Sequence, residues 1–534
     1  MSRCGGRVTN GDKNLSVSRY HSTVTSSSFI CRRWACRVSA ARLLVLVFAL
    51  ASASAIPAPR LTDAANLPTL GDTERGTLSP QMERRLGERI MRDIVRDPDY
   101  LDDAPTLEYM NDFGNGLLAA KPELRGEADF AFSFFVVRDP MLNAFALPGG
   151  FIAVHSALLL AAQSESELAS VVAHEIGHVA QRHIARQIGQ QKQDALIPLA
   201  GAILAALTVR ANPDAATAAL IGSEGLAIQR QLNFSREAER EADRVGLQVM
   251  RAAGYDTSGM IAFFGRMQTA TRAYTDTPAF LNSHPLTTER IADITERTRD
   301  LRYRQHADNP DFQLIRARMR VLQDDSAQGL RDASDQFTAQ LAQKNRLTTM
   351  AAKYGLAFVA LKRGDAARAQ TLLQEARAAQ SPSSSSSVMD FLGIDILLAA
   401  QKTADAVVLA DAARSRFPLS RGLARRYGET LLAAGRTDQA IAYLRDQAQL
   451  YRQEAALQDL LAKAYSATGK MTLQHLALAE SYAQSGSLPA ALDQLGIARK
   501  SPDASFYDQS LIDAREREFQ QRWRDELAET KKEK

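Results

Sequence analysis

The sequence predicts an α+β domain, mainly helical with a small sheet, at residues 56–300, followed by an all-α solenoid at residues 309–534. The sheet is indicated by two short runs of aromatic and β-branched residues between longer helical patterns. The solenoid is indicated by uninterrupted amphipathic helical patterns and by glycines that recur at a regular spacing. A chain of 534 residues is also too long for one hydrophobic core, which favours two folded domains.

Residues 1–55 are predicted to be a secretory signal peptide that is cleaved on export. A basic segment at 32–37 precedes the apolar run Leu43–Ala53, and small residues at 51–55 form A-x-A cleavage patterns. A transmembrane anchor is the less favoured alternative, because a span needs about 20 apolar residues and this run is about half as long. The basic stretch is unusually long for a signal peptide, so a translation start downstream of Met1 stays open.

Charge and cysteine content exclude several classes of protein. Eight of the 65 basic side chains but one of the 61 acidic ones lie in the segment 1–55, so the remaining chain has a net charge of −3. A near-neutral chain gives no electrostatic reason to expect nucleic acid as a partner. Cys4, Cys31 and Cys36 all precede the predicted cleavage site, so neither disulfides nor a cysteine nucleophile are expected in the mature protein.

The first part of the α+β domain combines helices with strands. Helical patterns are predicted at Gln81–Arg96 and Pro105–Ala120. The segments Phe130–Val137 and Phe151–His155 are predicted strands, because both are rich in aromatic and β-branched residues. Between them, Asn143–Leu147 is the expected sheet edge on which an extended substrate would pair.

Longer helices follow the predicted strands. One helix is predicted from Ser164 to about Gln193, because Ser164 and Glu167 form a capping box at its start. A second is predicted at Ser235–Ala253, ending at Gly254. The apolar run Ala195–Val209 is interpreted as a core or lid helix, because it is shorter than a membrane span. A peripheral membrane contact through this run is the alternative.

Turn glycines set the period of the C-terminal region. The interval from Gly364 to Gly435 is close to twice the interval from Gly435 to Gly469. A period of about 34 residues, which the shorter interval matches, is typical of tetratricopeptide repeats, whereas a generic helical bundle would not keep the period. The Ser- and Pro-rich segment 381–387 is interpreted as a loop within the array and not as a domain boundary.

The motif His174-Glu175-Ile-Gly-His178 carries the clearest chemistry in the chain. Positions four apart lie on one face of a helix, so both histidines can direct ring nitrogens at one zinc ion. Glu175 can reach the attacking water without binding the metal. A catalytic zinc ion needs a third protein ligand and keeps one position open, so one Zn²⁺ per chain is expected.

The other histidines are weak candidates for the third ligand. His183 lies five positions after His178, about 140° round a continuous helix, and is interpreted as an ordinary surface residue. His155, His306 and His475 have no supporting pattern.

Carboxylates on the helix at 235–253 are better candidates. Glu239 and Asp243 are four apart and share a face, which suits a ligand and a carboxylate that supports a ligating imidazole. The small Ala242 permits close packing against the metal-binding helix. Glu237 and Glu241 face elsewhere and are expected to be solvated.

The pattern His174-Glu-x-x-His178 followed by Glu239-x-x-Ala-Asp243 resembles the gluzincin peptidase family. That family includes the heat-shock proteases of the HtpX type and the CAAX prenyl endopeptidases. One branch of it, the periplasmic proteases that enhance β-barrel assembly in Gram-negative bacteria, is similar to more of the chain, namely Asn143–Ala146, His174–His183, Glu239–Gly246, Ser283–Ile291 and the trailing repeats. The similarity is densest from 140 to 295 and extends into the repeats, whereas the transmembrane helices of the membrane-embedded relatives are not predicted.

The resemblance implies a zincin-like catalytic domain with Glu239 as the third zinc ligand and Asp243 as its support. It also places His284, which precedes Pro285, on a loop near the metal. Two roles stay open for His284. It either fills the open zinc position at rest or donates a hydrogen bond to the oxyanion during turnover.

The resemblance further implies a periplasmic zinc metalloendopeptidase that degrades misassembled outer-membrane proteins and assists their assembly. Misfolded outer-membrane proteins would be its substrates, and the repeat domain would bind the assembly machinery. The alternative is a chaperone or scaffold for outer-membrane proteins in which proteolysis is incidental. A Glu175 variant that still supports assembly would favour this alternative.

Overall fold

The computed structural model describes residues 78–125, 129–190, 235–273, 280, 284–299, 306–343, 345–380 and 385–532. These residues belong to one compact unit, Pro68–Lys534. The predicted signal peptide and the predicted helix at Ala195–Val209 lie outside the described residues. Among the helices that are described, none combines the length and the apolar composition that a membrane span requires.

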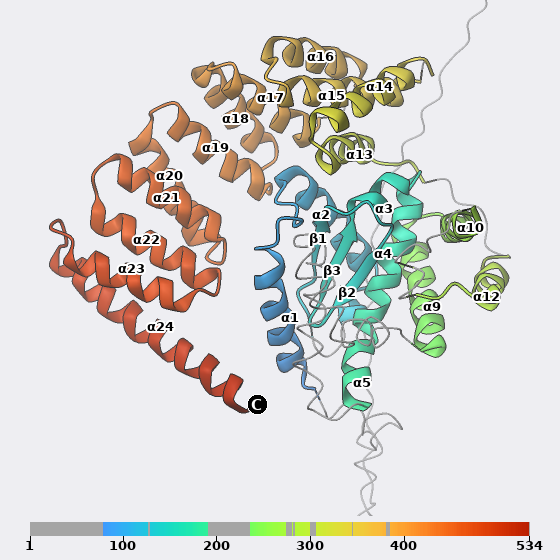
Figure 1. Cartoon of the computed structure of the whole chain (residues 1–534), viewed down its shortest axis with the longest axis horizontal. Coiled ribbons are helices and arrows are strands. Elements are labelled where there is room, and N and C mark those ends of the chain that lie inside the picture. The colour runs from blue at the N-terminus through green and yellow to red at the C-terminus, as the bar shows by residue number, and fades with distance from the viewer. Residues whose placement is uncertain are drawn as a thin grey trace, which may run out of the picture. The chain divides into compact units, whose positions relative to one another are not determined.

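The N-terminal region, up to residue 299, surrounds a small sheet with helices (Figure 1). Its elements in chain order are α1 (Pro80–Ile94), α2 (Ala104–Ala119), η1 (Pro122–Arg125), β1 (Ser133–Val137), β2 (Ala144–Leu147), β3 (Phe151–His155), α3 (Ser156–Ala161), α4 (Glu165–Ala180), α5 (His183–Gln190), α9 (Arg236–Ala253), α10 (Ser258–Ala273) and α12 (Thr288–Thr298). The predicted mixture of helices and a small sheet is therefore confirmed.

β3 lies at the centre of the sheet, with β1 parallel to it on one side and β2 antiparallel to it on the other. Successive side chains of β1 enter two different cores, as the period of a strand requires. Phe134 and Val136 pack in the core that holds α2 and α4, whereas Phe135 and Val137 pack with α1. Helices therefore cover both faces of the sheet, and β2 is an edge strand (Figure 1).

The single helix predicted from Ser164 to Gln193 is two helices, α4 and α5. Arg182 adopts a left-handed backbone conformation with φ +52°, which ends the helical path just before His183. Such a conformation is unfavourable for a residue with a Cβ. Side-chain contacts hold it: Nε of Arg182 donates to Glu83 at 2.9 Å, and Nη2 donates to the Leu78 carbonyl at 2.6 Å. The prediction was wrong because long-range contacts, which periodicity does not show, set this break.

Small residues let α9 approach α4 closely. A Cβ on Gly177 would lie 3.0 Å from the Cα of Ala242, and a Cβ on Gly246 would lie 3.2 Å from the backbone nitrogen of His174. α9 ends at Gly254, whose φ of +86° gives the left-handed cap that the sequence predicts. The close contact brings the carboxylates of α9 next to the histidines of α4.

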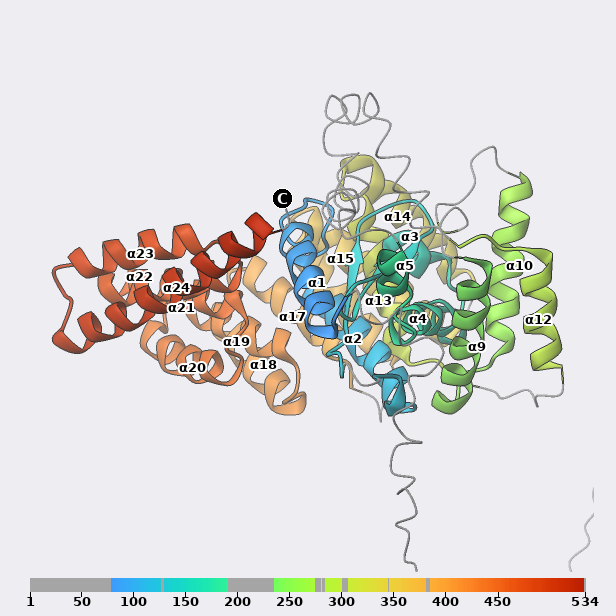
Figure 2. The same cartoon turned by 90° about the horizontal axis from the view of Figure 1, so that it is seen from below.

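The C-terminal region, from residue 306, is entirely helical where it is described (Figures 1 and 2). Its helices are α13 (Pro310–Gln323), α14 (Ala327–Leu341), α15 (Arg346–Lys362), α16 (Ala366–Ala379), α17 (Ser387–Ala399), α18 (Thr403–Arg416), α19 (Arg421–Ala433), α20 (Thr437–Leu450), α21 (Ala455–Ala467), α22 (Met471–Gln484), α23 (Leu488–Lys500) and α24 (Phe506–Lys532). Consecutive helices pack against each other, most extensively α15 with α16 and α22 with α23.

A left-handed residue lies in each of the turns between α15 and α16, α17 and α18, α19 and α20, and α21 and α22, at a regular interval. Gly364, Gln401, Gly435 and Gly469 have φ values of +80°, +58°, +71° and +70°. The intervals between them are all close to the period of about 34 residues that tetratricopeptide repeats keep. Gln401 therefore divides the double interval between Gly364 and Gly435, where no glycine marks the turn. The helical array is confirmed, and its assignment to the tetratricopeptide class stays a prediction.

α13 joins the C-terminal helices to α2 through a buried ion pair. Arg318 of α13 donates to both carboxylate oxygens of Asp103 at 2.6–2.8 Å. Asp103 also caps α2 by accepting from the backbone N–H of Thr106. Further along α2, Glu108 accepts a hydrogen bond from the hydroxyl of Ser420. The largest core cluster also continues from the N-terminal region into α13–α17.

Candidate metal centre

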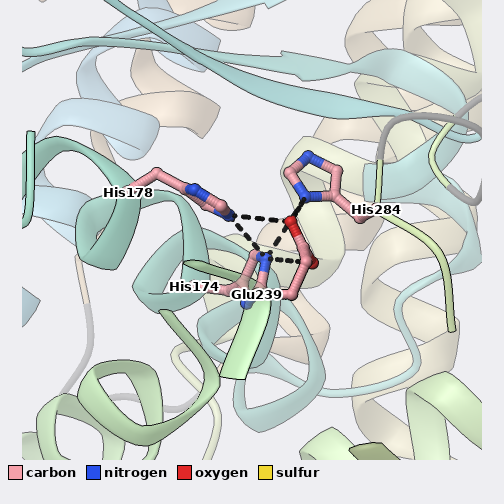
Figure 3. A group of neighbouring side chains, drawn as sticks. All are labelled: His174, His178, Glu239 and His284. Atoms are coloured by element: carbon pink, nitrogen blue, oxygen red, sulfur yellow. Dashed lines mark hydrogen bonds and ion pairs between the residues drawn. The ribbon is translucent and has the colours of Figure 1, made fainter. Parts of the chain in front are cut away.

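Four side chains direct their donor atoms at one buried point (Figure 3). His174 and His178 lie on α4, Glu239 lies on α9, and His284 precedes α12. Each is at most 1% exposed. Their donor atoms all lie within 4.8 Å of one another. The structure therefore brings together the three ligands predicted from the sequence and His284, which the resemblance places near the metal.

The donor spacing fits a single small metal ion. Nε2 of His174 lies 3.0 Å from Nε2 of His178 and 3.5 Å from Oε2 of Glu239. Nε2 of His178 lies 3.4 Å from Oε1 of Glu239. In a tetrahedral site with metal–ligand bonds of about 2.0–2.1 Å, donors lie about 3.3 Å apart. Two imidazoles and one carboxylate at this spacing can therefore share one metal ion.

Asp243 and Arg290 support this cluster from outside it. Oδ1 of Asp243 lies 3.0 Å from Nδ1 of His174, where the sequence predicts a supporting carboxylate. Arg290 of α12 donates to both oxygens of Asp243 at 2.8 Å. Its Nη1 also lies 2.6 Å from Oε2 of Glu239. Sequence reasoning missed Arg290, because one arginine in an amphipathic helix gives no signal of its own.

Glu175 is fully buried beside the four donors but is not one of them. Its Oε1 lies 3.5 Å from Nε2 of His284. Neither carboxylate oxygen makes a well-formed hydrogen bond within the described residues. Burial raises the pKa of Glu175, although the charges of His284 and His174 and the backbone amide of Ala146 act in the opposite direction. A buried carboxyl group of raised pKa is suited to take up a proton and return it.

Burial and neighbouring charges set the protonation of the candidate ligands. Burial alone raises the pKa of Glu239, but the charge of His284 and hydrogen bonds from the three histidines hold it well below its usual range. Burial holds the pKa of His178 well below its usual range. Burial also lowers the pKa of His174, yet hydrogen bonds with Asp243 and Glu239 outweigh it and raise that pKa to about 10. A metal ion must therefore displace the proton of His174.

Contacts of both the backbone and the ring hold His284 in place. Its backbone N–H donates to the carbonyl of Phe280 at 2.8 Å, and the two rings stack with centroids 4.7 Å apart. Arg290 donates to the carbonyl of Pro285, the next residue. Nδ1 of His284 lies 2.9 Å from Oε1 of Glu239. In this conformation the imidazole stands where a fourth ligand would stand.

One prediction about a neighbouring residue was wrong. His183, expected on the surface, is 4% exposed, and its Nδ1 lies 2.9 Å from Nδ1 of His178. The left-handed turn at Arg182 causes this error, because a continuous helix would have carried His183 to another face. Glu241 faces away from the metal donors with its side chain 26% exposed, and its Oε2 lies 3.2 Å from Nε2 of His183. Glu237 is exposed, as the sequence predicts.

The remaining histidines have neighbours of their own. Nδ1 of His155 lies 3.2 Å from the carbonyl oxygen of Met141. Nε2 of His306 lies 3.4 Å from a carboxylate oxygen of Glu165. His475 contacts a glutamine within the helical array. None of these three histidines belongs to the four-donor cluster.

Comparison with known proteins adds a family and several relatives. Residues 117–298 match the family described as "Peptidase family M48". The chain is 30% identical over 462 residues to the beta-barrel assembly-enhancing protease of Escherichia coli K12, covering 86% of this chain and 92% of that protein. It is 31% identical over 456 residues to the protein of the same name from Yersinia pestis, covering 84% of this chain and 90% of that protein.

A third relative matches a shorter stretch more closely. This Vibrio cholerae protein, which carries the same name provisionally, is 38% identical over 271 residues. The match covers 50% of this chain and 54% of the Vibrio protein, so the chain spans about half the length of that relative.

Proposed function

Because the chain belongs to peptidase family M48 and is therefore a metallopeptidase, we propose that its metal is zinc and that it is an endopeptidase of the bacterial envelope. The observation that carries this proposal is the convergence of His174, His178 and Glu239 beside Glu175. Two imidazoles and one carboxylate are a donor set typical of catalytic zinc, whereas cysteine is prominent among the ligands of structural zinc sites.

Glu175 is the proposed proton carrier of the reaction. Zinc bound to His174, His178 and Glu239 would lower the pKa of a water molecule and polarise the scissile carbonyl. Glu175 takes a proton from the attacking water and delivers it to the leaving amine. Its burial favours this exchange, because the raised pKa brings the neutral and ionised forms closer in free energy. Asp243 and Arg290 orient the ligands through their contacts with His174 and Glu239.

The proposed docking site for the substrate backbone is the edge of β2 that pairs with no other described strand. The carbonyl of Asn143 accepts from the N–H of His155, so this pair bonds across the sheet. In the antiparallel alternation, the backbone polar groups of Ala144 and Ala146 then point away from β3. An extended peptide added to this edge would pass beside Glu175.

An Ala144→Pro variant tests the docking site, because proline removes one outward N–H from an edge strand. The KM for an extended peptide should rise, while the zinc content stays unchanged. An unchanged KM would remove β2 from substrate binding.

His284 is proposed to close the site at rest as a fourth donor. Its Nδ1 lies among the other donor atoms. A residue that only donates a hydrogen bond to the oxyanion during turnover would not need to lie there. His284→Ala should therefore raise basal proteolysis with little change in zinc content. If His284 is an oxyanion donor instead, the same variant should lose about 10²–10³-fold in turnover.

The metal and the chemistry are tested together on the full-length protein. Zinc content and casein digestion should be measured for the wild type and for His174→Ala. We expect about one zinc ion per chain and proteolysis in the wild type, and neither in the variant. Proteolysis by a wild-type chain that contains no metal would contradict the proposal.

The cellular role rests on the names of the relatives. The Escherichia coli and Yersinia pestis proteins are beta-barrel assembly-enhancing proteases. We propose that this chain is exported by its segment 1–55, works in the periplasm and degrades misassembled outer-membrane proteins. The helices after residue 309 are the proposed repeat domain that binds the assembly machinery. Recovery of the chain from a periplasmic extract, with a new N-terminus near residue 56, would support this location, and recovery of the uncleaved chain from the cytoplasm would contradict it.

Assistance in assembly is the second candidate function, and the relatives' name favours it by joining assembly to proteolysis. The two functions separate in an Escherichia coli strain that lacks its relative. If proteolysis is essential, the wild type should restore β-barrel assembly and Glu175→Gln should not. If Glu175→Gln restores assembly as well as the wild type, the chain acts mainly as a chaperone.

A further inference from the structure

A row of polar contacts runs outward from the candidate ligand His178. Nε2 of His178 faces the other metal donors, whereas its Nδ1 lies 2.9 Å from Nδ1 of His183. Nε2 of His183 then lies 3.2 Å from Oε2 of Glu241, which Arg186 also contacts at 3.1 Å. His178 and His183 are buried, and the side chain of Glu241 is 26% exposed. The contacts therefore lead from the metal site to the surface.

Binding of a metal by Nε2 of His178 fixes the direction of each hydrogen bond. A neutral imidazole has one proton, so ligation through Nε2 leaves that proton on Nδ1. Nδ1–H of His178 then donates to Nδ1 of His183, because two facing ring nitrogens need one donor and one acceptor. The proton of His183 consequently lies on Nε2 and donates to the carboxylate of Glu241.

The other histidine ligand has a matching partner. Nδ1 of His174 lies 3.0 Å from a carboxylate oxygen of Asp243. Nδ1 of each candidate histidine ligand is thus connected to a carboxylate of α9. Nδ1 of His174 contacts Asp243 directly, whereas Nδ1 of His178 is connected to Glu241 through His183. The intermediate imidazole is needed because Glu241 lies two positions after Glu239, about 200° round α9, and faces away from the metal.

We propose that His183 and Glu241 are positioning residues that hold His178 in the ring orientation and tautomer that bind the metal. This inference rests on the proposed metal site. Loss of such an outer hydrogen-bond partner typically weakens metal affinity by about 10–100-fold. The turn at Arg182, and not helical spacing, places His183 there.

The test measures zinc affinity of the metal-free full-length protein by competition with a chromophoric chelator. His183→Leu should weaken zinc binding by about 10–100-fold, and Glu241→Ala should weaken it by a smaller factor. His183→Asn should recover most of the affinity, because its Oδ1 can accept from Nδ1–H of His178. Glu237→Ala, on the exposed side of α9, is the matched control and should bind zinc like the wild type.

Melting of the metal-free proteins separates positioning from a purely structural role. Equal melting midpoints for His183→Leu and His183→Asn, with different zinc affinities, would support positioning. This inference would be overturned, without affecting the proposed metal site, if the two variants had equal zinc affinities. The same holds if His183→Leu bound zinc as tightly as the wild type. A wild-type chain without zinc affinity would overturn the proposed metal site and this inference with it.

Discussion

Two of the buried charged clusters among the described residues differ in how completely their polar groups are paired. At the junction of α2 and α13, Asp103 accepts from Arg318 and from Thr106, and Arg318 also donates to the hydroxyl of Tyr354. One positive and one negative group neutralise each other there. At the metal centre, both carboxylate oxygens of Glu175 are buried without a well-formed hydrogen bond among the described residues.

The difference distinguishes a cluster that stabilises the fold from the one that we propose performs the chemistry. Unpaired buried polar groups are rare in proteins and cost free energy, and a catalytic role is one reason why such a group persists. The nitrogen and oxygen donors around His174 are spaced for an ion, whereas Arg318 and Asp103 are spaced for each other. Substitutions at the metal centre should therefore alter zinc affinity, whereas substitutions at the junction of α2 and α13 should alter the stability of the fold.

Glu239→Ala should have the largest effect on metal binding. The variant lacks a charged oxygen that lies 3.4 Å from Nε2 of His178. Loss of a residue that only hydrogen-bonds to a ligand weakens metal affinity by about 10–100-fold, and loss of a ligand should weaken zinc affinity further. Chelator competition measures this fall, and Glu237→Ala on the same helix is the control. A Glu239→Ala variant that keeps wild-type affinity would show that another residue is the third ligand.

Arg318→Met should destabilise the fold without affecting the metal centre. Removal of one partner from a buried ion pair typically costs about 3–5 kcal/mol, because the other charge is left unpaired. Urea denaturation should show this loss, while the folded variant still binds about one zinc ion per chain. Adding Asp103→Asn should restore much of the stability, because asparagine removes the charge and still caps α2. A double variant no more stable than Arg318→Met would contradict this account of the junction.

Zinc affinity should depend on pH with a sign set by His174. Burial alone lowers the pKa of His174, but its carboxylate neighbours raise it to about 10, so the metal-free protein holds this proton at neutral pH. Zinc must displace it, so affinity should rise about tenfold for each pH unit between about pH 6 and about pH 8 and fall as the pH drops. Calorimetry in buffers of different ionisation enthalpy should detect about one released proton. Affinity that is independent of pH would mean that His174 is already neutral.

Much of the candidate site could be predicted because its spacing is local. The four-position intervals from His174 to His178 and from Glu239 to Asp243 place each pair on one helical face, and the structure puts both faces together. The boundary of α9 at Gly254 was predictable for the same reason, since glycine favours the left-handed cap.

The remaining features depend on contacts between distant segments. His183 reaches His178 because Arg182 is held in a left-handed conformation by Glu83 and by the carbonyl of Leu78, both far earlier in the chain. Arg290 gives no periodic signal, and Gln401 takes a left-handed turn that glycine usually marks. Local periodicity cannot reveal such positions.

The most direct test of a metal centre that works through Glu175 is one comparison of Glu175→Gln with the wild type. Zinc content and cleavage of an unfolded protein are measured on the same preparations. The glutamine cannot accept the proton, so cleavage should fall by about 10²–10⁴-fold, while zinc stays near one per chain. Wild-type cleavage by the variant would contradict the proposed role of Glu175, and loss of zinc would show that Glu175 is itself a ligand.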